Sequence, residues 1–367
     1  MKLDFTNSEL QYPLPGFPRL IRCQRIILWE EIGRDSRKLS TSSLLLRQSF
    51  PRWSGKLVIS YIQLENKVQF SALKKQESEH LPLKLLLARH LWGVDQSNGF
   101  TPYIDHWRSM GYEALEGSSR TVLDASLLRR TLKREKFGWI AQVFSNMFVP
   151  GGTVQQHLLS LRSQIDECFE AEPLFFNCHS GSDAWSGAEA EDFYGAVLEM
   201  EKEIGVALSH ETHRARYFAN PWNTREILNR FPELKLTCDL SHWVCIAERL
   251  LQDCNDIIDL CAAHCHHIHA RVGYEEGPQV PDPRAPEWSA HLEAHEAWWS
   301  KIWNAQQARG FQSSSLTPEF GPPPYLHTAP YTQQPVADLN SICDWMAQRE
   351  RDRFHARGGT VRDARGN

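Results

Sequence analysis

The amino-acid sequence predicts a (β/α)8 TIM barrel with an N-terminal extension, and two observations carry this prediction. First, eight short apolar runs that end in polar or small residues occur between residues 81 and 349, and amphipathic stretches follow several of them. Second, the last residues of successive runs lie 27 to 47 positions apart, and one strand-plus-helix unit takes about 30 residues. Eight such units make a closed barrel of ordinary size.

The eight apolar runs are the expected strands of the barrel. They cover residues 85–90, 112–117, 137–144, 174–179, 206–211, 234–239, 267–272 and 314–319. The step between the last two runs is the widest, and it holds a proline-rich segment followed by a tryptophan-rich helix. An insertion after a strand at the mouth of a barrel is where we expect substrate contacts.

Two of the stretches between the runs have clear features of helices. Residues 189–204 repeat apolar side chains at a spacing close to 3.6 positions, and Gly205 follows as the expected C-terminal cap. Residues 223–230 form a shorter expected helix, which Asn223 or Thr224 could cap at its start.

The chain divides into three expected parts. Residues 81–349 hold the barrel. Residues 1–80 contain short apolar pieces interrupted by proline, serine and basic residues, so we expect an extension that packs loosely or stays mobile, or alternatively a small cap over the main domain. Residues 350–367 are charged and contain glycine, and we expect this tail to be flexible.

Composition and charge exclude several classes of protein. With 41% hydrophobic and 23% charged residues, the chain can form a globular core and does not have the composition of a disordered protein or a coiled coil. No run of about 18 apolar residues and no apolar N-terminal block occurs, so neither a membrane partner nor a secretory signal is expected. Nine cysteines without regular spacing favour reduced thiols and a cytoplasmic location.

The distribution of charge also bears on partners. Residues 1–80 carry 13 basic and 8 acidic residues, a net charge of +5, and the remainder carries 27 and 37, a net charge of −10, which together give the total of −5. Nucleic-acid binding requires clustered positive charge. The acidic main body therefore argues against a nucleic-acid partner.

Acidic and histidine residues stand where four successive runs end, and the carboxyl ends of barrel strands converge on one mouth. These residues are Glu211, Asp239, His269 and Glu319. Any one of them alone would ordinarily be solvated or would cap a helix. Together, the three carboxylates would repel one another unless a cation neutralised them. Such a set of oxygen and nitrogen donors suits Mn²⁺ or Mg²⁺ best, with Zn²⁺, Co²⁺ or Fe²⁺ as alternatives.

This arrangement resembles that of the xylose isomerase-like TIM barrels. The matching pattern is Asp239-x-x-His242, with Glu211 one strand earlier, His269 one strand later and Glu319 on the last strand. The resemblance covers about residues 81–349 and none of the extension. The superfamily includes sugar isomerases, ketose 3-epimerases, inosose and dehydroshikimate dehydratases, and zinc-dependent apurinic endonucleases. Residues 273–284, Gly-Tyr-Glu-Glu-Gly-Pro-Gln-Val-Pro-Asp-Pro-Arg, are similar to a loop of sugar isomerase/epimerase relatives.

The resemblance implies that the four strand-end residues are metal ligands, and that Glu211 and Glu319 also act as acid and base on opposite faces of the substrate. It further implies that His242 orients substrate hydroxyls and that Arg271 contacts a hydroxyl, carboxylate or phosphate. His179 falls where relatives place a histidine near the mouth.

Aromatic and acidic residues near other strand ends are additional candidates for substrate contact. Trp92 follows the first run, and further tryptophans lie in the late insertion; most are expected to pack in the core, and the alternative is that Trp92 and one tryptophan of the insertion wall the pocket. Glu116, at the end of the second run, is expected either to contact substrate or to be solvated.

The chain departs from two of the family's subgroups. Ketose 3-epimerases usually carry a glutamate shortly after the first ligand and an arginine shortly after the ligand histidine, and Tyr217 and Glu275 fall near those positions. An ordinary ketohexose is therefore not the expected substrate. The apurinic endonucleases need further histidines for three zinc ions, but the third run ends at Phe144 without one and Arg284 stands where another is expected. DNA repair is therefore not expected.

The expected function is that of a divalent-metal-dependent isomerase or epimerase in carbohydrate metabolism. Its substrate would be a small sugar-like or cyclic polyhydroxy carbonyl compound, and the reaction would pass through proton abstraction and a metal-stabilised enediolate. One alternative is a dehydratase, a lyase of the inosose or dehydroshikimate type that uses the same site. Another is a non-catalytic barrel that serves as a binding protein. A homo-oligomer is left open.

Overall fold

The computed structural model describes residues 83–95, 99–118, 125–146 and 152–361. Its strands are β1 Lys84–His90, β2 Ala114–Ser118, β3 Gly138–Phe144, β4 Phe175–His179, β5 Leu208–Glu211, β6 Lys235–Cys238, β7 Cys265–His269, β8 Ser313–Thr317 and β9 Thr360–Val361. Its helices are α2 Thr101–Ser109, α3 Ala125–Glu135, α4 Val154–Phe169, α5 Gly187–Ile204, α6 Pro221–Arg230, α7 Ser241–Ala247, α8 Asn255–His264, α9 Ser289–Ala308 and α10 Leu339–Ala356, with short 3-10 turns η2 Tyr217–Ala219 and η3 Pro286–Trp288. The expected extension, residues 1–80, lies outside the described residues.

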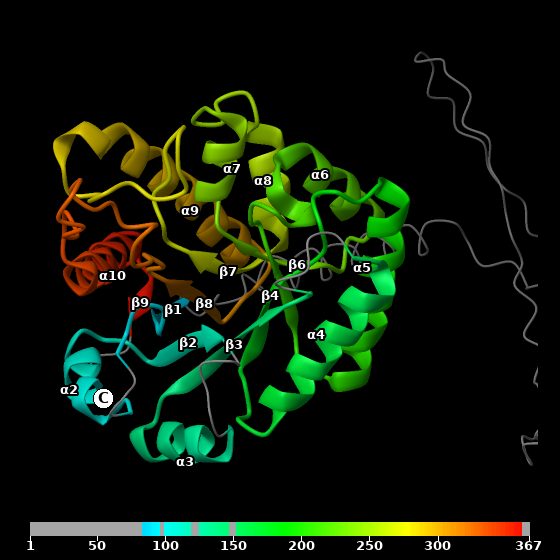
Figure 1. Cartoon of the computed structure of the whole chain (residues 1–367), viewed down its shortest axis with the longest axis horizontal. Coiled ribbons are helices and arrows are strands. Elements are labelled where there is room, and N and C mark those ends of the chain that lie inside the picture. Colours follow the sequence, from blue (N-terminus) through cyan, green and yellow to red (C-terminus); the bar gives the residue numbers. More distant parts are fainter. Residues whose placement is uncertain (1–82, 96–98, 119–124, 147–151, 362–367) are drawn as a thin grey trace, which may run out of the picture. The chain divides into compact units, whose positions relative to one another are not determined.

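Strands β1 to β8 form a closed parallel barrel with helices around it (Figure 1). Each strand pairs in parallel with the next, and β1 closes the barrel by pairing with both β2 and β8. The predicted (β/α)8 fold is therefore confirmed. None of the helices in the described ranges is long and apolar enough to cross a membrane.

The end of the chain continues further into the fold than its charge suggests. The tail was expected to begin at residue 350, but that position falls within α10, where Glu350 and Phe354 are buried. Beyond α10, the short strand β9 pairs in parallel with β1 at Lys84 and Leu85.

Local signals explain where the other elements begin and end. Gly205 adopts a left-handed conformation with φ of 68° and caps α5, as predicted. Helix α6 begins at Pro221 and not at residue 223, because Asn220 caps it and proline is well tolerated in the first turn. Strand β7 ends at His269, and the next three residues, which were expected in the strand, are buried but leave the parallel ladder.

The barrel interior changes from apolar to polar along its axis. Ala88, Ala114, Ile140 and Phe175, from the first four strands, pack together as an apolar layer. Since side chains alternate along a strand, residues two positions further on face the same interior. These include His90, Glu116, Gln142 and Asn177, all of which are buried and polar. The interior therefore presents titratable groups at the carboxyl-terminal mouth, and the apolar layer lies below them.

Candidate active site

Four strand ends bring the predicted ligand residues together at the mouth. Glu211 ends β5, Asp239 follows β6, His269 ends β7, and Glu319 lies two residues beyond β8. One potential ligand atom from each lies within 4.8 Å of those of the other three, and all four side chains are buried. We call these residues the quartet.

His269 is oriented toward the quartet by a carboxylate on its other side. Its Nδ1 atom lies 2.9 Å from Oε2 of Glu319, 3.6 Å from Oε2 of Glu211 and 3.9 Å from Oδ2 of Asp239. Its Nε2 atom lies 2.9 Å from Oε1 of Glu116. A carboxylate on the outer nitrogen of an imidazole fixes the ring and leaves the inner nitrogen to bind a metal.

Glu116 lies beneath the quartet and does not line the cavity, so the expected substrate contact is wrong. Its side chain is fully buried, and it contacts His269, His267, Asn177 and Thr317. A charged residue at a strand end is usually solvated. Here the histidines of β7 pair with Glu116 and offset part of the free-energy cost of burying its charge.

Glu211 is held by two neighbours on β4. Asn177 donates to its Oε2 at 2.8 Å, and Nε2 of His179 lies 2.8 Å from the same oxygen. Burial disfavours the charge of Glu211, but the imidazoles of His179 and His269 outweigh burial and lower the pKa of this carboxyl to about 2. Glu211 is therefore a carboxylate at neutral pH.

Arg271 reaches the opposite side of the quartet. Its Nη2 atom donates to Oδ2 of Asp239 at 2.5 Å and lies 3.0 Å from Oε2 of Glu319. Burial and the neighbouring carboxylates raise the pKa of Asp239 to about 7, although Arg271 acts against that shift. Burial also opposes the charge of Glu319, but Arg271 and His269 outweigh it and lower the pKa of Glu319 well below its usual range.

The donor set of the quartet fits a divalent cation. Oε1 of Glu211 is buried and makes no hydrogen bond with any described residue. Nδ1 of His269 and Oε2 of Glu319 are buried 2.9 Å apart and face each other within the quartet. The carboxylates around His269 outweigh its burial and raise the pKa of the imidazole well above its usual value, which shows how strongly the site favours positive charge. Buried His, Glu and Asp clusters of this kind could bind a metal. A second group, His179, Glu211 and His213, shares Glu211 with the quartet.

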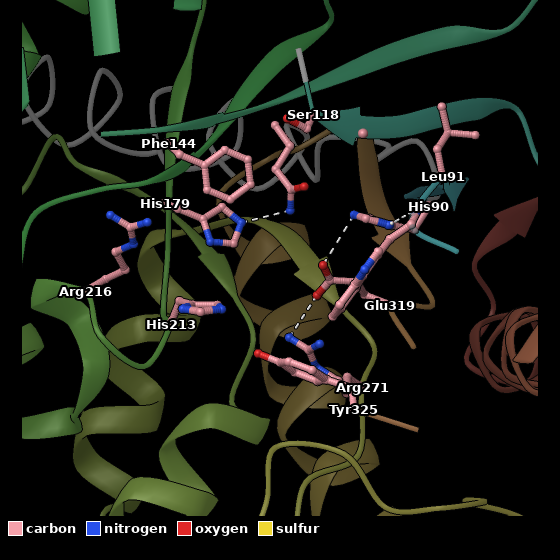
Figure 2. A pocket seen from close by; sticks show the side chains of 13 residues that line it. His90, Leu91, Ser118, Phe144, His179, His213, Arg216, Arg271, Glu319 and Tyr325 are labelled. Carbon is pink, nitrogen blue, oxygen red and sulfur yellow. Dashed lines mark hydrogen bonds and ion pairs between the residues drawn. The ribbon is translucent and has the colours of Figure 1, made fainter. Parts of the chain in front are cut away.

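A cavity of about 480 Å³ opens above the quartet. Figure 2 shows the side chains that line it, with Glu319 contacting both His90 and Arg271. The lining residues are His90, Leu91, Trp92, Gly117, Ser118, Gln142, Phe144, His179, His213, Arg216, Arg271, Glu319 and Tyr325. A cavity of this size accommodates a small polyhydroxylated molecule.

Among the predicted substrate contacts, Trp92, His179 and Arg271 line the cavity. His242 does not, because it is fully buried behind them, with its Nε2 2.9 Å from Nη2 of Arg271. His242 therefore contacts Arg271 and does not itself form part of the cavity wall.

The tryptophans of the late insertion do not line the cavity, so the alternative that one of them walls the pocket is wrong. Trp298, Trp299 and Trp303 lie on the buried side of α9 and belong to the hydrophobic core. The second aromatic wall comes instead from Tyr325, whose ring packs edge-on against Trp92 with centroids 4.9 Å apart.

Several polar or aromatic lining residues were not singled out from the sequence, among them His90, His213, Arg216 and Tyr325. His90, like the quartet, ends an apolar run, and this signal could have found it. His213 and Arg216 follow Glu211 in a loop, and Tyr325 follows a run of prolines. Loop residues of these types ordinarily face solvent, so only the path of the chain reveals that they turn inward.

Solved structures with similar folds identify the architecture further. A D-tagatose 3-epimerase-like protein superposes with a TM-score of 0.51 at 11% identity, covering 74% of this chain and 97% of its own. A xylose isomerase-like TIM barrel protein from Mycobacterium smegmatis, in complex with magnesium, has a TM-score of 0.50 at 10% identity, with coverages of 75% and 97%. This chain has the fold of the xylose isomerase-like TIM barrels.

A probable 3-DHS dehydratase from Bacillus anthracis is also similar, with a TM-score of 0.49, 12% identity and coverages of 73% and 99%. The similar solved structures thus include an epimerase-like protein and a probable dehydratase. No family model and no curated protein matches the sequence.

Proposed function

We propose that the protein is a divalent-metal-dependent isomerase or epimerase that acts on a sugar-like or cyclic polyhydroxy carbonyl compound. The observation that carries this proposal is the convergence of Glu211, Asp239, His269 and Glu319 at the floor of a substrate-sized cavity. Fold alone does not assign an activity, so the proposal depends on the chemistry of these side chains.

The quartet would hold the metal ion. Its oxygen and nitrogen donors suit Mn²⁺ or Mg²⁺, and a similar barrel was solved in complex with magnesium. A divalent ion in this position would supply Lewis-acid polarisation of a substrate carbonyl and make the adjacent C–H more acidic. His269 is prepared for this role because Glu116 engages its outer nitrogen.

Two glutamates of the quartet can move the proton. Glu319 lines the cavity, and the pKa values of Glu319 and Glu211 both lie below the usual range, so each is ionised at neutral pH and has an oxygen that can accept a proton. One glutamate would remove the proton next to the carbonyl. Delivery of a second proton, taken up from solvent by the other glutamate, to the opposite face of the same carbon gives an epimer. Transfer of the first proton by the same glutamate to the neighbouring carbon gives an isomer.

The cavity wall suits a cyclic or extended polyol. Trp92 and Tyr325 offer aromatic faces on which the apolar side of a sugar ring can pack. Arg271 and His179 offer polar groups at the same wall, and each is tied to a member of the quartet. Substrate binding and proton transfer would therefore share one set of residues.

Exchange of substrate hydrogen with deuterated solvent tests the proposal. The full chain, loaded with Mn²⁺, is incubated in D₂O with a panel of ketoses, aldoses and inososes, and deuterium incorporation is followed by NMR. We expect incorporation at the carbon next to the carbonyl of at least one compound, with the rate reduced about 10²- to 10⁴-fold in Glu319→Gln. Glu199→Gln, an exposed glutamate on α5, is the matched control. Unchanged exchange in Glu319→Gln would exclude its proposed role.

A dehydratase acting on the same cavity is the second candidate, and His90 favours it. Nε2 of His90 lies 3.3 Å from Oε1 of Glu319 at the cavity wall, where it could protonate a leaving hydroxyl after the first proton is removed. Loss of water forms a conjugated double bond with ultraviolet absorbance, whereas isomerisation leaves the mass unchanged. A third candidate, a non-catalytic binding protein, predicts no stoichiometric divalent ion in protein purified without chelator.

A further inference from the structure

The wall of the cavity contains a buried cation that forms no ion pair with any described residue. Arg216 is only 9% exposed and lines the cavity. No carboxylate oxygen of the described residues lies within 4.0 Å of its guanidinium nitrogens. Buried charges in proteins are normally paired, because desolvation is costly. An unpaired buried guanidinium beside a cavity is therefore best explained by a ligand that brings the negative charge.

Two backbone features position the guanidinium of Arg216: the conformation of the preceding residue and a hydrogen bond to a main-chain carbonyl. Ala215, directly before it, has a left-handed φ of 61° although it is not glycine, a conformation that costs free energy and is retained where it places a side chain. Nη1 of Arg216 donates to the carbonyl of Ser145 at 2.8 Å, and no other described residue accepts from the guanidinium. The bond to Ser145 fixes the group and leaves its other edge available.

Glu319, the acidic residue that lines the cavity, does not neutralise Arg216. Glu319 is already paired with Arg271 and His90. Glu211 and Asp183 both favour the charge of Arg216, but neither comes within 4.0 Å of its guanidinium nitrogens, and one oxygen of Glu211 is occupied by Asn177 and His179. In Figure 2, Arg216 lies on the other side of the cavity from His90 and Glu319. A ligand could therefore reach the quartet with one end and Arg216 with the other.

We propose that Arg216 selects an acidic substrate: its guanidinium binds a carboxylate carried by the polyhydroxy carbonyl compound whose reacting end lies at the quartet. This inference rests on the proposed function, because it names the substrate class of the same cavity. One free edge of a guanidinium matches the two oxygens of a planar carboxylate. A phosphate ester is less well matched, because its three terminal oxygens would call for more donors than this single edge.

Binding measurements on matched pairs of compounds test this inference. The full chain with Mn²⁺ is titrated calorimetrically with D-galacturonate and D-galactose, with D-gluconate and D-glucitol, and with quinate and methyl quinate. We expect at least one acid to bind about 10-fold or more tightly than its neutral partner, and Arg216→Gln to remove this preference, since a charge-assisted hydrogen bond contributes about 10- to 100-fold in affinity. Arg249→Gln, at an exposed arginine paired with Asp253, should retain it.

Several outcomes would overturn the inference. The first is equal binding of every acid and its neutral partner, and the second is an acid preference that survives in Arg216→Gln. The third is stronger displacement of the bound acid by inorganic phosphate than by acetate, because this would assign the anionic group of the substrate to a phosphate ester. Should Arg216→Gln fail to fold, Arg216→Lys decides, because it keeps the charge and loses the fork: a weakened preference supports the inference, and an unchanged one overturns it. Metal content measured on the same samples tests the proposed function separately.

Discussion

The Nη2 atom of Arg271 lies 3.0 Å from Oε2 of Glu319, so that a guanidinium reaches directly into the proposed metal site. The same atom donates to Asp239, and Arg271 thereby balances the charge of two of the three carboxylates of the quartet. A permanent cation at this position stabilises the site when no metal is bound and competes with a metal for the same oxygens.

Replacement of Arg271 separates these two effects. In the presence of EDTA, we expect Arg271→Gln to lower the free energy of unfolding by about 3 kcal/mol, since it leaves buried carboxylates without a partner. The same variant should bind Mn²⁺ more tightly than the native chain, because the competing charge is gone. Urea unfolding and Mn²⁺ titration measure the two quantities, with Arg249→Gln as the control. Weaker Mn²⁺ binding by Arg271→Gln would show that the guanidinium does not compete with the ion.

Removal of one carboxylate of the quartet should weaken metal binding while keeping the shape of the site. We expect Asp239→Asn to lower affinity for Mn²⁺ at least about 10-fold, because the amide presents a neutral oxygen to the ion. Mn²⁺ binding followed by electron paramagnetic resonance, together with elemental analysis, checks this. Asp253→Asn, at an exposed position, provides the comparison. Stoichiometric metal with native affinity in Asp239→Asn would argue for a different site.

Glu116 should influence the metal without touching it. Because it holds the outer nitrogen of His269 at 2.9 Å, we expect Glu116→Gln to reduce Mn²⁺ affinity about 10-fold. The ¹⁵N chemical shifts of the His269 ring should change in the same variant, which a merely structural role would not produce. Retention of both the native affinity and the native ring signals would remove Glu116 from this role.

A buried pair of glutamates away from the cavity predicts a dependence of stability on pH. Burial and the neighbouring Glu296 raise the pKa of Glu350 to about 8. Since the folded state holds this proton and the unfolded state releases it near pH 4.5, stability falls as the pH rises between these values. We expect Glu350→Gln, which mimics the protonated group, to remove this decline and to be more stable than the native chain by about 1 to 2 kcal/mol at pH 9. Urea unfolding across pH 5 to 9 measures it.

The matched control for that experiment is Glu293→Gln, because Glu293 lies on the exposed side of α9. It should leave the slope of stability against pH unchanged. An identical slope in Glu350→Gln and the native chain would show that Glu350 is ionised throughout this range.

The barrel and the quartet could be predicted from the sequence for a specific physical reason. Parallel strands that are buried on both faces read as apolar runs, and a titratable residue such as Glu211 or His269 stands out at the point where such a run ends. Convergence of the strand ends then follows from closure of the barrel.

The residues that the sequence did not reveal depend on the path of the loops and on burial. Arg216 turns inward only because Ala215 adopts a left-handed conformation, and no sequence pattern announces that turn. Glu116 was expected near substrate because charged strand ends are usually open to solvent, whereas β7 supplies two histidines to bury it. Tyr325 takes the place that the alternative gave to a tryptophan of α9, because the apolar face of that helix packs into the core.

The pairing of β9 with β1 joins the two ends of the described barrel (Figure 1). Thr360 and Val361 run beside Lys84 and Leu85, just where β1 has not yet met β2. Thr360 and Val361 thus extend the sheet at the amino-terminal end of β1, at the opposite end of this strand from His90 at the mouth. A chain shortened at Ala356 would leave backbone amide and carbonyl groups of β1 unsatisfied, and these are the groups through which sheet edges recruit foreign strands. We therefore expect removal of β9 to make this barrel more prone to aggregation.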